Sequence, residues 1–263
     1  MTESLQTDVL RDEAVFADKY YARYANELAV NPQMFNMYRS PSRLWNYREK
    51  MGSLFGDLAG KSVLDLGCGM GEEAIYLAKL GARVSAIDIS EVGIAITRQR
   101  AAFNDVSDRV AAYVMQATPT EFPPATFDLV HGIGILHHVG LDAGLREVQR
   151  ILKPGGGAIF WEPLGNSPLI EKCKEYVAKR FGRRFRLHDV TEHEENLKLR
   201  ELRGYRTEFA YFRLYPYHLF YRIRKLVFPV WMRDWVRAFD YQLLRAMPFL
   251  SYYAGGVLLH LKK

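Results

Sequence analysis

The sequence predicts an α/β fold in which a mostly parallel sheet carries helices on both faces. Between residues 62 and 163, short apolar segments alternate with segments of helical periodicity. Such alternation indicates parallel βαβ units, because two parallel strands need a long crossover connection. The chain has 263 residues, of which 49% are hydrophobic, and this suffices for one large core domain.

The N-terminal residues 10–58 are predicted to be helical. Tyrosines, methionines and a tryptophan recur through this stretch. Pro32 and Pro41 should divide it into short helices, because proline removes a backbone donor and clashes with the preceding turn.

Five strands with intervening helices follow. The segment SVLDLG (62–67) is a buried strand, and residues 72–80 form a helix that Gly81 ends. RVSAIDIS is a second strand that ends at Asp88, and Ser90 is a suitable N-cap for the next helix. RVAAYVMQ is a third strand and TFDLVHGIGILHH contains a fourth. A helix is predicted around 145–152, and the fifth strand lies in LKPGGGAIFWEP.

The pattern is looser after Pro163. Residues 171–180 are predicted to form a helix, and residues 207–215 and 256–261 to form the sixth and seventh strands. Residues 216–253 are aromatic and basic. We interpret them as a helical insertion on a single core that spans 61–263, and not as an independent domain.

Composition narrows the class of protein. The first 18 residues are polar and acidic, unlike a secretory leader, and no apolar run reaches the roughly 18 residues that a membrane-spanning helix needs. The two cysteines, Cys68 and Cys173, suggest neither a disulfide framework nor a metal site. We therefore expect a cytoplasmic protein without a metal. The net charge of +6 does not by itself indicate nucleic acid, because no recognition module accompanies it.

The turn after the first strand indicates the ligand. Its glycines, Gly67, Gly69 and Gly71, have the spacing G-x-G-x-G, and Glu72 stands where a dinucleotide fold has its packing glycine. Asp65 beside this turn would repel a pyrophosphate but suit a positively charged group. This disfavours an NAD-dependent oxidoreductase.

Asp88, at the end of the second strand, is placed for ribose hydroxyls. A cationic nucleoside without phosphate is therefore expected, and S-adenosylmethionine fits. The alternative, that the glycines only shape a tight turn, leaves Asp65 and Asp88 unexplained.

The four segments VLDLGCGMG, AIDIS, FDLVHGIGILHHV and LKPGGGAIFWEP resemble, in order, the motifs of class I S-adenosylmethionine-dependent methyltransferases of the small-molecule, type 11 kind. The resemblance covers about two-fifths of the chain. It implies a Rossmann-like, seven-stranded sheet, a cofactor whose amino-acid end lies near Asp65, and close backbone approach at Gly67, Cys68 and Gly69.

The resemblance also implies the remaining cofactor contacts. Asp88 would bind the ribose, with Ile89 against the adenine. Ala117 and Thr118 would border the adenine amino group, although many relatives carry an aspartate near Thr118. The methionine moiety would lie along two residues that end the fourth strand, Gly132 and Ile133.

Candidate catalytic residues follow the fourth and fifth strands. Methyl transfer needs an in-line approach, and a base is needed only if the acceptor must lose a proton. His137 and His138 lie where open α/β sheets bind ligands, and histidine accepts a proton near neutrality. Glu162 could orient a histidine or bind a polar substrate group. Structural roles for all three residues stay open, and we interpret His131 as a structural histidine on a strand.

The variable segments bear on the acceptor. The resemblance implies that residues 1–60 form a helical lid over cofactor and substrate, with Tyr20, Tyr21 and Tyr38 as candidate contacts. The insertion at 216–253 fits a cover over an apolar pocket, a surface at a membrane interface, or a contact with a second subunit of a homodimer.

We therefore expect a methyltransferase that acts on a small or lipophilic acceptor, most simply at oxygen. Carbon methylation of a quinone- or polyketide-like ring is the nearest alternative. A hypothesis of another class is a non-catalytic subunit that binds the cofactor or docks on a membrane, suggested by the absence of an acidic residue at Thr118.

Overall fold

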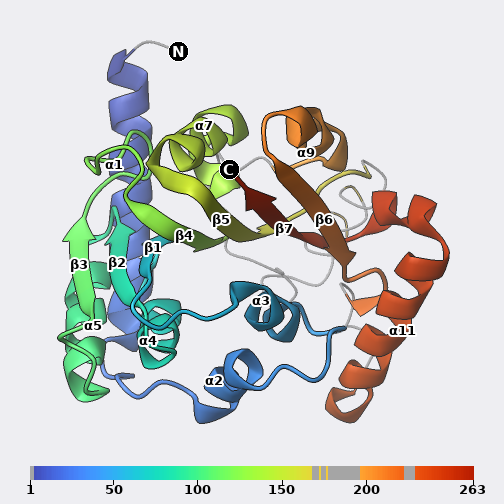
Figure 1. The fold of residues 1–263 in the computed structure, drawn as a ribbon, viewed down its shortest axis with the longest axis horizontal. Coiled ribbons are helices and arrows are strands. Elements are labelled where there is room, and N and C mark those ends of the chain that lie inside the picture. The colour runs from blue at the N-terminus through green and yellow to red at the C-terminus, as the bar shows by residue number, and fades with distance from the viewer. Residues whose placement is uncertain (1–2, 168–171, 173–175, 177–195, 222–228) are drawn as a thin grey trace.

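The computed structural model describes residues 3–167, 172, 176, 196–221 and 229–263. A seven-stranded sheet with the order β3-β2-β1-β4-β5-β7-β6 forms its centre (Figure 1). The strands are β1 (Ser62–Leu66), β2 (Arg83–Asp88), β3 (Val110–Val114), β4 (Phe127–Ile133), β5 (Leu152–Pro163), β6 (Tyr211–Tyr217) and β7 (Gly256–Lys262). Strands β1 to β5 pair in parallel, and β7 is antiparallel to both β5 and β6. The predicted mostly parallel, Rossmann-like sheet is confirmed.

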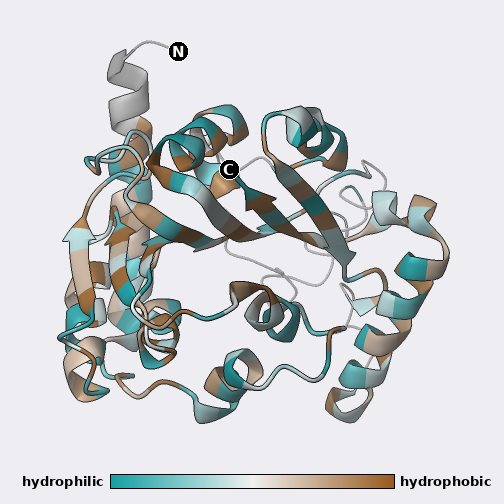
Figure 2. Ribbon diagram, in the orientation of Figure 1, coloured by the Kyte–Doolittle hydropathy of each residue, from teal (hydrophilic) through white to brown (hydrophobic). Residues whose placement is uncertain are grey.

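Helices cover both faces of this sheet. One core lies beneath α6 (Leu136–Val139), α7 (Leu141–Ile151) and α9 (Leu199–Gly204). The other lies beneath α2 (Pro32–Arg39), α3 (Tyr47–Phe55), α4 (Glu72–Lys79) and α5 (Glu91–Phe103). In Figure 2 the hydrophobic colours run along the central strands, where side chains face these two cores. None of the described helices is long and apolar enough to cross a lipid bilayer.

The N-terminal segment breaks into helices at the predicted prolines. Helix α1 (Glu3–Tyr21) continues into a short 3₁₀ turn, η1 (Ala22–Tyr24). Pro32 begins α2, and the Asn31 side chain caps it by accepting from the Gln33 amide at 2.9 Å. Helix α2 ends at Arg39, two residues before Pro41.

Three predicted boundaries differ from the structure. The helix expected around 145–152 begins four residues earlier, at Leu141, because Gly140 ends the preceding turn with a φ of +81°. The sixth strand begins at Tyr211 and not at residue 207, because Tyr205–Thr207 forms a 3₁₀ turn, η3. Tyr217 belongs to that strand and not to the helical insertion. Most of the helix predicted at 171–180 lies outside the described residues.

The C-terminal insertion is helical where the structure describes it. It contains the 3₁₀ turn η5 (Val230–Met232), α11 (Arg233–Ala246) and the 3₁₀ segment η6 (Pro248–Tyr253). In Figure 1, α11 lies beyond β6, at the edge of the molecule opposite β3.

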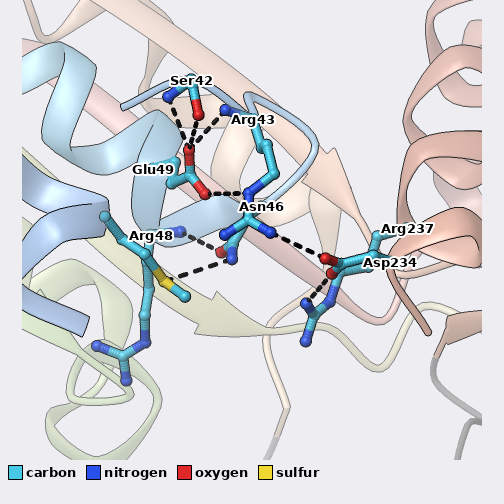
Figure 3. A network of polar contacts seen from close by, with 8 residues as sticks. Ser42, Arg43, Asn46, Arg48, Glu49, Asp234 and Arg237 are labelled. Atoms are coloured by element: carbon cyan, nitrogen blue, oxygen red, sulfur yellow. Dashed lines mark hydrogen bonds and ion pairs between the residues drawn. The ribbon is translucent and has the colours of Figure 1, made fainter. Parts of the chain in front are cut away.

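A buried carboxylate, Glu49, joins the N-terminal segment to α11 (Figure 3). Glu49 Oε2 accepts from the Ser42 amide at 2.7 Å and from the Arg43 amide at 2.5 Å, and its Oε1 accepts from Arg43 Nε at 2.7 Å. The same guanidinium donates to Asp234 Oδ2 of α11 at 2.9 Å. Burial alone would raise the pKa of Glu49, but these donors outweigh it and lower the pKa below its ordinary value.

Replacing this carboxylate should destabilise the protein. We expect Glu49→Gln to lower the free energy of unfolding by about 2 kcal/mol at neutral pH, because it removes a charged acceptor from buried donors. Since the folded-state pKa is lowered, the loss should be largest at neutral pH and shrink as the pH falls through the carboxyl range. Urea unfolding of the exposed-site control Glu121→Gln measures the background. Equal losses in the two variants would contradict the assignment.

Candidate functional site

The turn between β1 and α4 is shaped by left-handed glycines. Gly67, Gly69 and Gly71 have φ angles of +70°, +55° and +74°, which residues with a side chain rarely adopt. The Cys68 amide donates to the Ile87 carbonyl at 2.9 Å, which holds the turn against the end of β2. Burial raises the pKa of the Cys68 thiol, and nearby Asp88 and Asp65 add to the shift. Cys68 is therefore a neutral, space-filling thiol.

Asp88 fixes the turn from the neighbouring strand. Its Oδ2 accepts from the Gly69 amide at 2.8 Å, and its Oδ1 accepts from the Ser90 amide at 2.9 Å. Burial raises the pKa of Asp88, and the two amides oppose that shift. A carboxylate has lone pairs for about four hydrogen bonds, so Asp88 can still accept from a ligand.

Asp65 lies on β1 beside the turn and faces His131 on β4. The two residues are register partners in the parallel pair, and Asp65 Oδ1 lies 2.8 Å from His131 Nδ1. Because an ionised carboxylate only accepts, Nδ1 carries the proton. His131 Nε2 lies 3.2 Å from the Met51 sulfur of α3. Asp65 Oδ2 is buried and has no hydrogen-bond partner among the described residues.

A cavity of about 750 Å³ opens where Asp65 and the glycine turn meet the N-terminal helices. Its walls come from the end of α1 and η1, the start of α2, α3, the glycine turn and the start of α4. The lining residues on which the argument depends are Tyr20, Tyr21, Tyr24, Arg48, Asp65, Gly67, Cys68, Gly69, Glu72, Arg100 and Ile133.

Two arginines line this cavity and differ in what they bind. Arg100 is buried and donates to the Glu27 carbonyl at 2.9 and 2.7 Å and to the Met70 carbonyl at 3.3 Å, so it ties the N-terminal segment to the glycine turn. Arg48 Nη1 donates to the Tyr38 hydroxyl at 2.9 Å and pairs with Glu73. Arg48 therefore places a positive charge in the cavity that also holds Asp65.

The N-terminal helix α1 lies directly on the glycine turn. A Cβ added to Gly69 would lie 3.0 Å from the Tyr21 hydroxyl, and one added to Gly93 would lie 3.0 Å from the Tyr21 ring. Asp18 Oδ1 accepts from the Ser90 hydroxyl and from the Val92 amide, the latter at 3.1 Å. Burial raises the pKa of Tyr21, and Asp88 adds to that shift.

His137 and Glu162 form a second polar pair, after β4 and at the end of β5. Glu162 is fully buried, and its Oε1 accepts from the Ile135 and Leu136 amides at 3.0 and 2.9 Å. Its Oε2 lies 2.8 Å from His137 Nδ1. With Nδ1–H donating to the carboxylate, Nε2 is the ring nitrogen that could accept a proton.

The neighbouring histidine has a weaker carboxylate partner. His138 Nδ1 lies 3.6 Å from Glu13 Oε1 of α1, and its ring centroid lies 4.3 Å from that of His137. The geometry thus distinguishes two histidines that are adjacent in sequence.

The structure gathers part of the predicted cofactor set around the cavity. Its walls include five of the predicted cofactor residues, namely Asp65, Gly67, Cys68, Gly69 and Ile133. Asp88 lies behind the turn, while Ala117 and Gly132 are buried in the core, and Ile89 and Thr118 are half-buried. Tyr20 and Tyr21 line the cavity. Tyr38 is instead buried against Phe55 and Tyr76, and its hydroxyl accepts a hydrogen bond from Arg48.

Sequence reasoning missed three residues of this site. Arg48 and Arg100 lie far from the glycine turn in sequence, and no motif marks them. His131 was interpreted as a structural histidine, and its role as the partner of Asp65 follows from the β1–β4 register. Of the three, only His131 could have been found from the sequence, because residues at matching positions of neighbouring parallel strands lie side by side.

The comparisons with known proteins agree with this geometry. Residues 63–156 match the family model described as "Methyltransferase domain". The match covers the glycine turn, β2 and β4, which carry the first three motifs, and the first five residues of the fourth motif at the start of β5. The predicted resemblance to methyltransferases is thus confirmed for residues 63–156.

Two curated relatives are methyltransferases of small molecules. The "Ubiquinone biosynthesis O-methyltransferase" of Sodalis glossinidius is 33% identical over 160 residues, which are 58% of this chain and 60% of the relative. The "27-O-demethylrifamycin SV methyltransferase" of Amycolatopsis mediterranei is 40% identical over 101 residues, 37% of each chain. The chain therefore matches less than two thirds of the length of either relative.

Among solved structures, the fold is similar to that of the geranyl diphosphate C-methyltransferase from Streptomyces coelicolor A3(2). The TM-score is 0.55 at 16% identity, and the match covers 81% of this chain and 75% of that chain. At this identity the likeness concerns the fold.

The turn should not tolerate a side chain at Gly71. A Cβ there would lie 2.4 Å from Thr97 Cγ2, whereas a Cβ on Gly60, whose φ is also positive, would meet nothing within 4 Å. Gly60→Ala should cost about 1 kcal/mol of stability from backbone strain, and Gly71→Ala should cost about 1–3 kcal/mol more from overpacking. Urea unfolding of both variants measures the difference. Equal losses would mean that the turn relaxes around Thr97.

Proposed function

We propose that the protein is an S-adenosylmethionine-dependent methyltransferase that acts on a small or lipophilic acceptor, at oxygen. The observation that carries the proposal is the unpartnered Oδ2 of Asp65, buried in the wall of a cavity shaped by the glycine turn. A buried carboxylate oxygen without a donor is costly unless a ligand supplies one. An ammonium group supplies it.

The cavity suits a zwitterionic amino-acid group. Asp65 would take the ammonium of the cofactor, and Arg48 would take its carboxylate, since a guanidinium binds carboxylates through paired donors. Gly67 and Gly69 pack closely against Ile135 and Tyr21, so a side chain at either glycine would displace these residues from the wall of the cavity. When bound, S-adenosylmethionine supplies an electrophilic methyl group on a sulfonium.

The lid assignment rests on α1. Tyr21 lies over Gly69 and beside Gly93, and Asp18 anchors the helix on the first turn of α5. The ribose is expected near Asp88, beneath Tyr21. Binding would then require either a shift of Tyr21 or its packing on the nucleoside, and in both cases α1 excludes water from the site.

His137 is the proposed general base. Glu162 fixes its Nδ1 proton, so Nε2 is the atom that would accept a proton from an acceptor hydroxyl. A general base suits an oxygen acceptor, because a hydroxyl becomes a strong nucleophile only when it loses its proton. A neutral amine is already nucleophilic and needs no base before it attacks. One relative above is named as an O-methyltransferase of ubiquinone biosynthesis and the other as a methyltransferase of 27-O-demethylrifamycin SV, which supports oxygen as the acceptor atom.

Binding of the cofactor can be tested at its amino-acid end. Asp65→Asn and Arg48→Gln should each weaken S-adenosylhomocysteine binding roughly 10- to 100-fold in calorimetric titration, because each removes a charged hydrogen bond.

The control for this test is a ligand that lacks the relevant groups. Methylthioadenosine has neither the ammonium nor the carboxylate, so its affinity should stay the same in both variants. A parallel loss for the two ligands would mean that the variants disturb the turn itself. Absence of binding by the unmodified protein to S-adenosylmethionine and S-adenosylhomocysteine would overturn the proposed function.

The base assignment can be tested by turnover. We expect His137→Ala to lower kcat by roughly 10²–10⁴, with S-adenosylhomocysteine affinity unchanged, because proton removal and not cofactor binding is lost. Glu162→Gln should lower kcat less than His137→Ala does, and it should also alter the acidic limb of the pH–rate profile. The acceptor for this assay is first identified by screening phenols, quinols and lipophilic acids with S-adenosylmethionine that carries a labelled methyl group.

His138→Ala is the matched control, since its ring lies beside that of His137 and its Nδ1 lies 3.6 Å from Glu13 Oε1 of α1. If His138→Ala loses as much activity as His137→Ala, the pair positions the acceptor. Full activity of His137→Ala across the pH range would exclude it as the base.

A further inference from the structure

Positively charged side chains gather on one face of the sheet, where β6 pairs with β7. In the β6–β7 register, Tyr211 stands opposite Lys262. Two residues further along β6, Arg213 stands opposite His260. Opposed residues share a face, as do alternate residues of one strand, and Tyr215 on this face packs on the core beneath α3. The basic cluster, as we call it, consists of Lys50 of α3, Arg213, His260 and Lys262.

Lys50 joins the cluster from α3, which packs against β5 and β7. Its Nζ lies 4.7 Å from the centroid of the Tyr215 ring, and Arg213 Cζ lies 5.6 Å from the same centroid. Burial lowers the pKa of Lys50, and the charge of Arg213 lowers it further. The two cations are therefore close enough to repel each other.

His260 is half-buried among these cations and has an unpartnered nitrogen. Its Nδ1 is buried and has no hydrogen-bond partner in the part of the chain that the structure describes. The Tyr211 ring lies 5.0 Å from the His260 ring and 5.9 Å from Lys262 Nζ. Burial lowers the pKa of His260, and the charges of Lys262 and Lys50 lower it further, to about 4. An anion in the cluster would supply an acceptor for an N–H at this nitrogen.

The described residues provide no counter-charge for the cluster. Lys50, Arg213 and Lys262 take part in none of the ion pairs formed among them, although Arg43 and Arg48 of the same N-terminal segment each pair with a carboxylate. Like charges that are held together without a counter-charge repel one another, and burial strengthens the repulsion. The arrangement is costly by itself, and a bound anion would relieve that cost.

We propose that the basic cluster binds a phosphate group, either of free phosphate or of a small phosphate ester. A phosphate ester carries about −1.5 to −2 charges at neutral pH and has three acceptor oxygens, so it matches several cations better than a single carboxylate does. Arg213 offers planar paired donors to the phosphate oxygens, while Lys50 and Lys262 supply point charges. The site is separate from the proposed cofactor site, because no residue of the cluster lines the cavity around Asp65.

NMR titration of the histidine ring protons tests the site in the full chain. The chain has seven histidines, and the His260 signals are identified by their loss in His260→Gln. At pH 7 these signals should move to a saturable limit when phosphate replaces chloride at constant ionic strength. Acetate at the same ionic strength should leave them in place.

Variants of the two exposed cations test the assignment. Arg213→Gln and Lys262→Gln should each weaken phosphate binding roughly 3- to 10-fold, because each removes a charge from the site without opening the core. The matched control is Arg203→Gln, which removes the same charge from an exposed position on α9, the helix that covers the opposite face of the sheet. This variant should bind phosphate like the unmodified protein.

Two further ligands distinguish the source of the phosphate group. Glycerol 3-phosphate should move the His260 signals at least as strongly as inorganic phosphate does. Vesicles that contain phosphatidic acid present the same group at a lipid surface. Flotation with these vesicles, without any binding of the two soluble phosphates, would make the cluster a lipid contact and overturn the proposal.

Two other outcomes would also overturn it. One is the absence of a saturable movement of the His260 signals. The other is an equal loss of phosphate binding in Arg203→Gln, which would mean that phosphate only screens the net positive charge of the chain. Because the readout is phosphate binding, these outcomes are independent of the cofactor titration that tests methyl transfer.

Discussion

The buried pair of Asp65 and His131 is the interaction on which the site depends. It joins adjacent parallel strands at their carboxyl edge, and through Met51 it also reaches α3 of the N-terminal segment. His131 satisfies one oxygen of Asp65 and fixes the direction of the other. A buried carboxylate oxygen without a donor is energetically costly. In the proposed function the ammonium of the cofactor supplies that donor.

The N-terminal segment is part of the site and not only a cover for it. Helix α3 brings Arg48 into the cavity and Met51 against His131, while its Glu49 organises the preceding loop and, through Arg43, reaches α11. Arg100 of α5 and Asp18 of α1 form further hydrogen bonds that hold the N-terminal segment on α5. The helices at residues 3–55 and the sheet thus share buried polar groups, which makes separate unfolding of this segment costly.

Two polar pairs lie on different sides of the sheet and meet at one edge. Asp65 and His131 face the core beneath α3 and α4, whereas Glu162 with His137 faces the core beneath α6 and α7. Both cores end at the carboxyl edge of the parallel strands, where α/β folds bind ligands. The proposed cofactor and the proposed base can act on one reaction because the sheet brings two separately built subsites to a common edge.

The sequence by itself determined the sheet, the glycine turn and the acid at the end of β2. These depend on local patterns, namely short apolar strands between helical segments, glycines in the turn after the first strand, and helix caps. It also marked His137 and Glu162 as candidates, each from its place after a strand.

Only the tertiary structure decided which of these residues touch. Arg48, Arg100 and His131 enter the site through contacts with residues 25, 30 and 80 positions away in the sequence, and no local pattern encodes such contacts. Tyr38 was expected at the lid and lies in the core instead, because aromatic spacing in a helix does not reveal which face is buried. Likewise, the aromatic residues after Pro229 left core and surface undecided, and it was the anchoring of Asp234 and Asp240 that turned Trp231 and Trp235 outward.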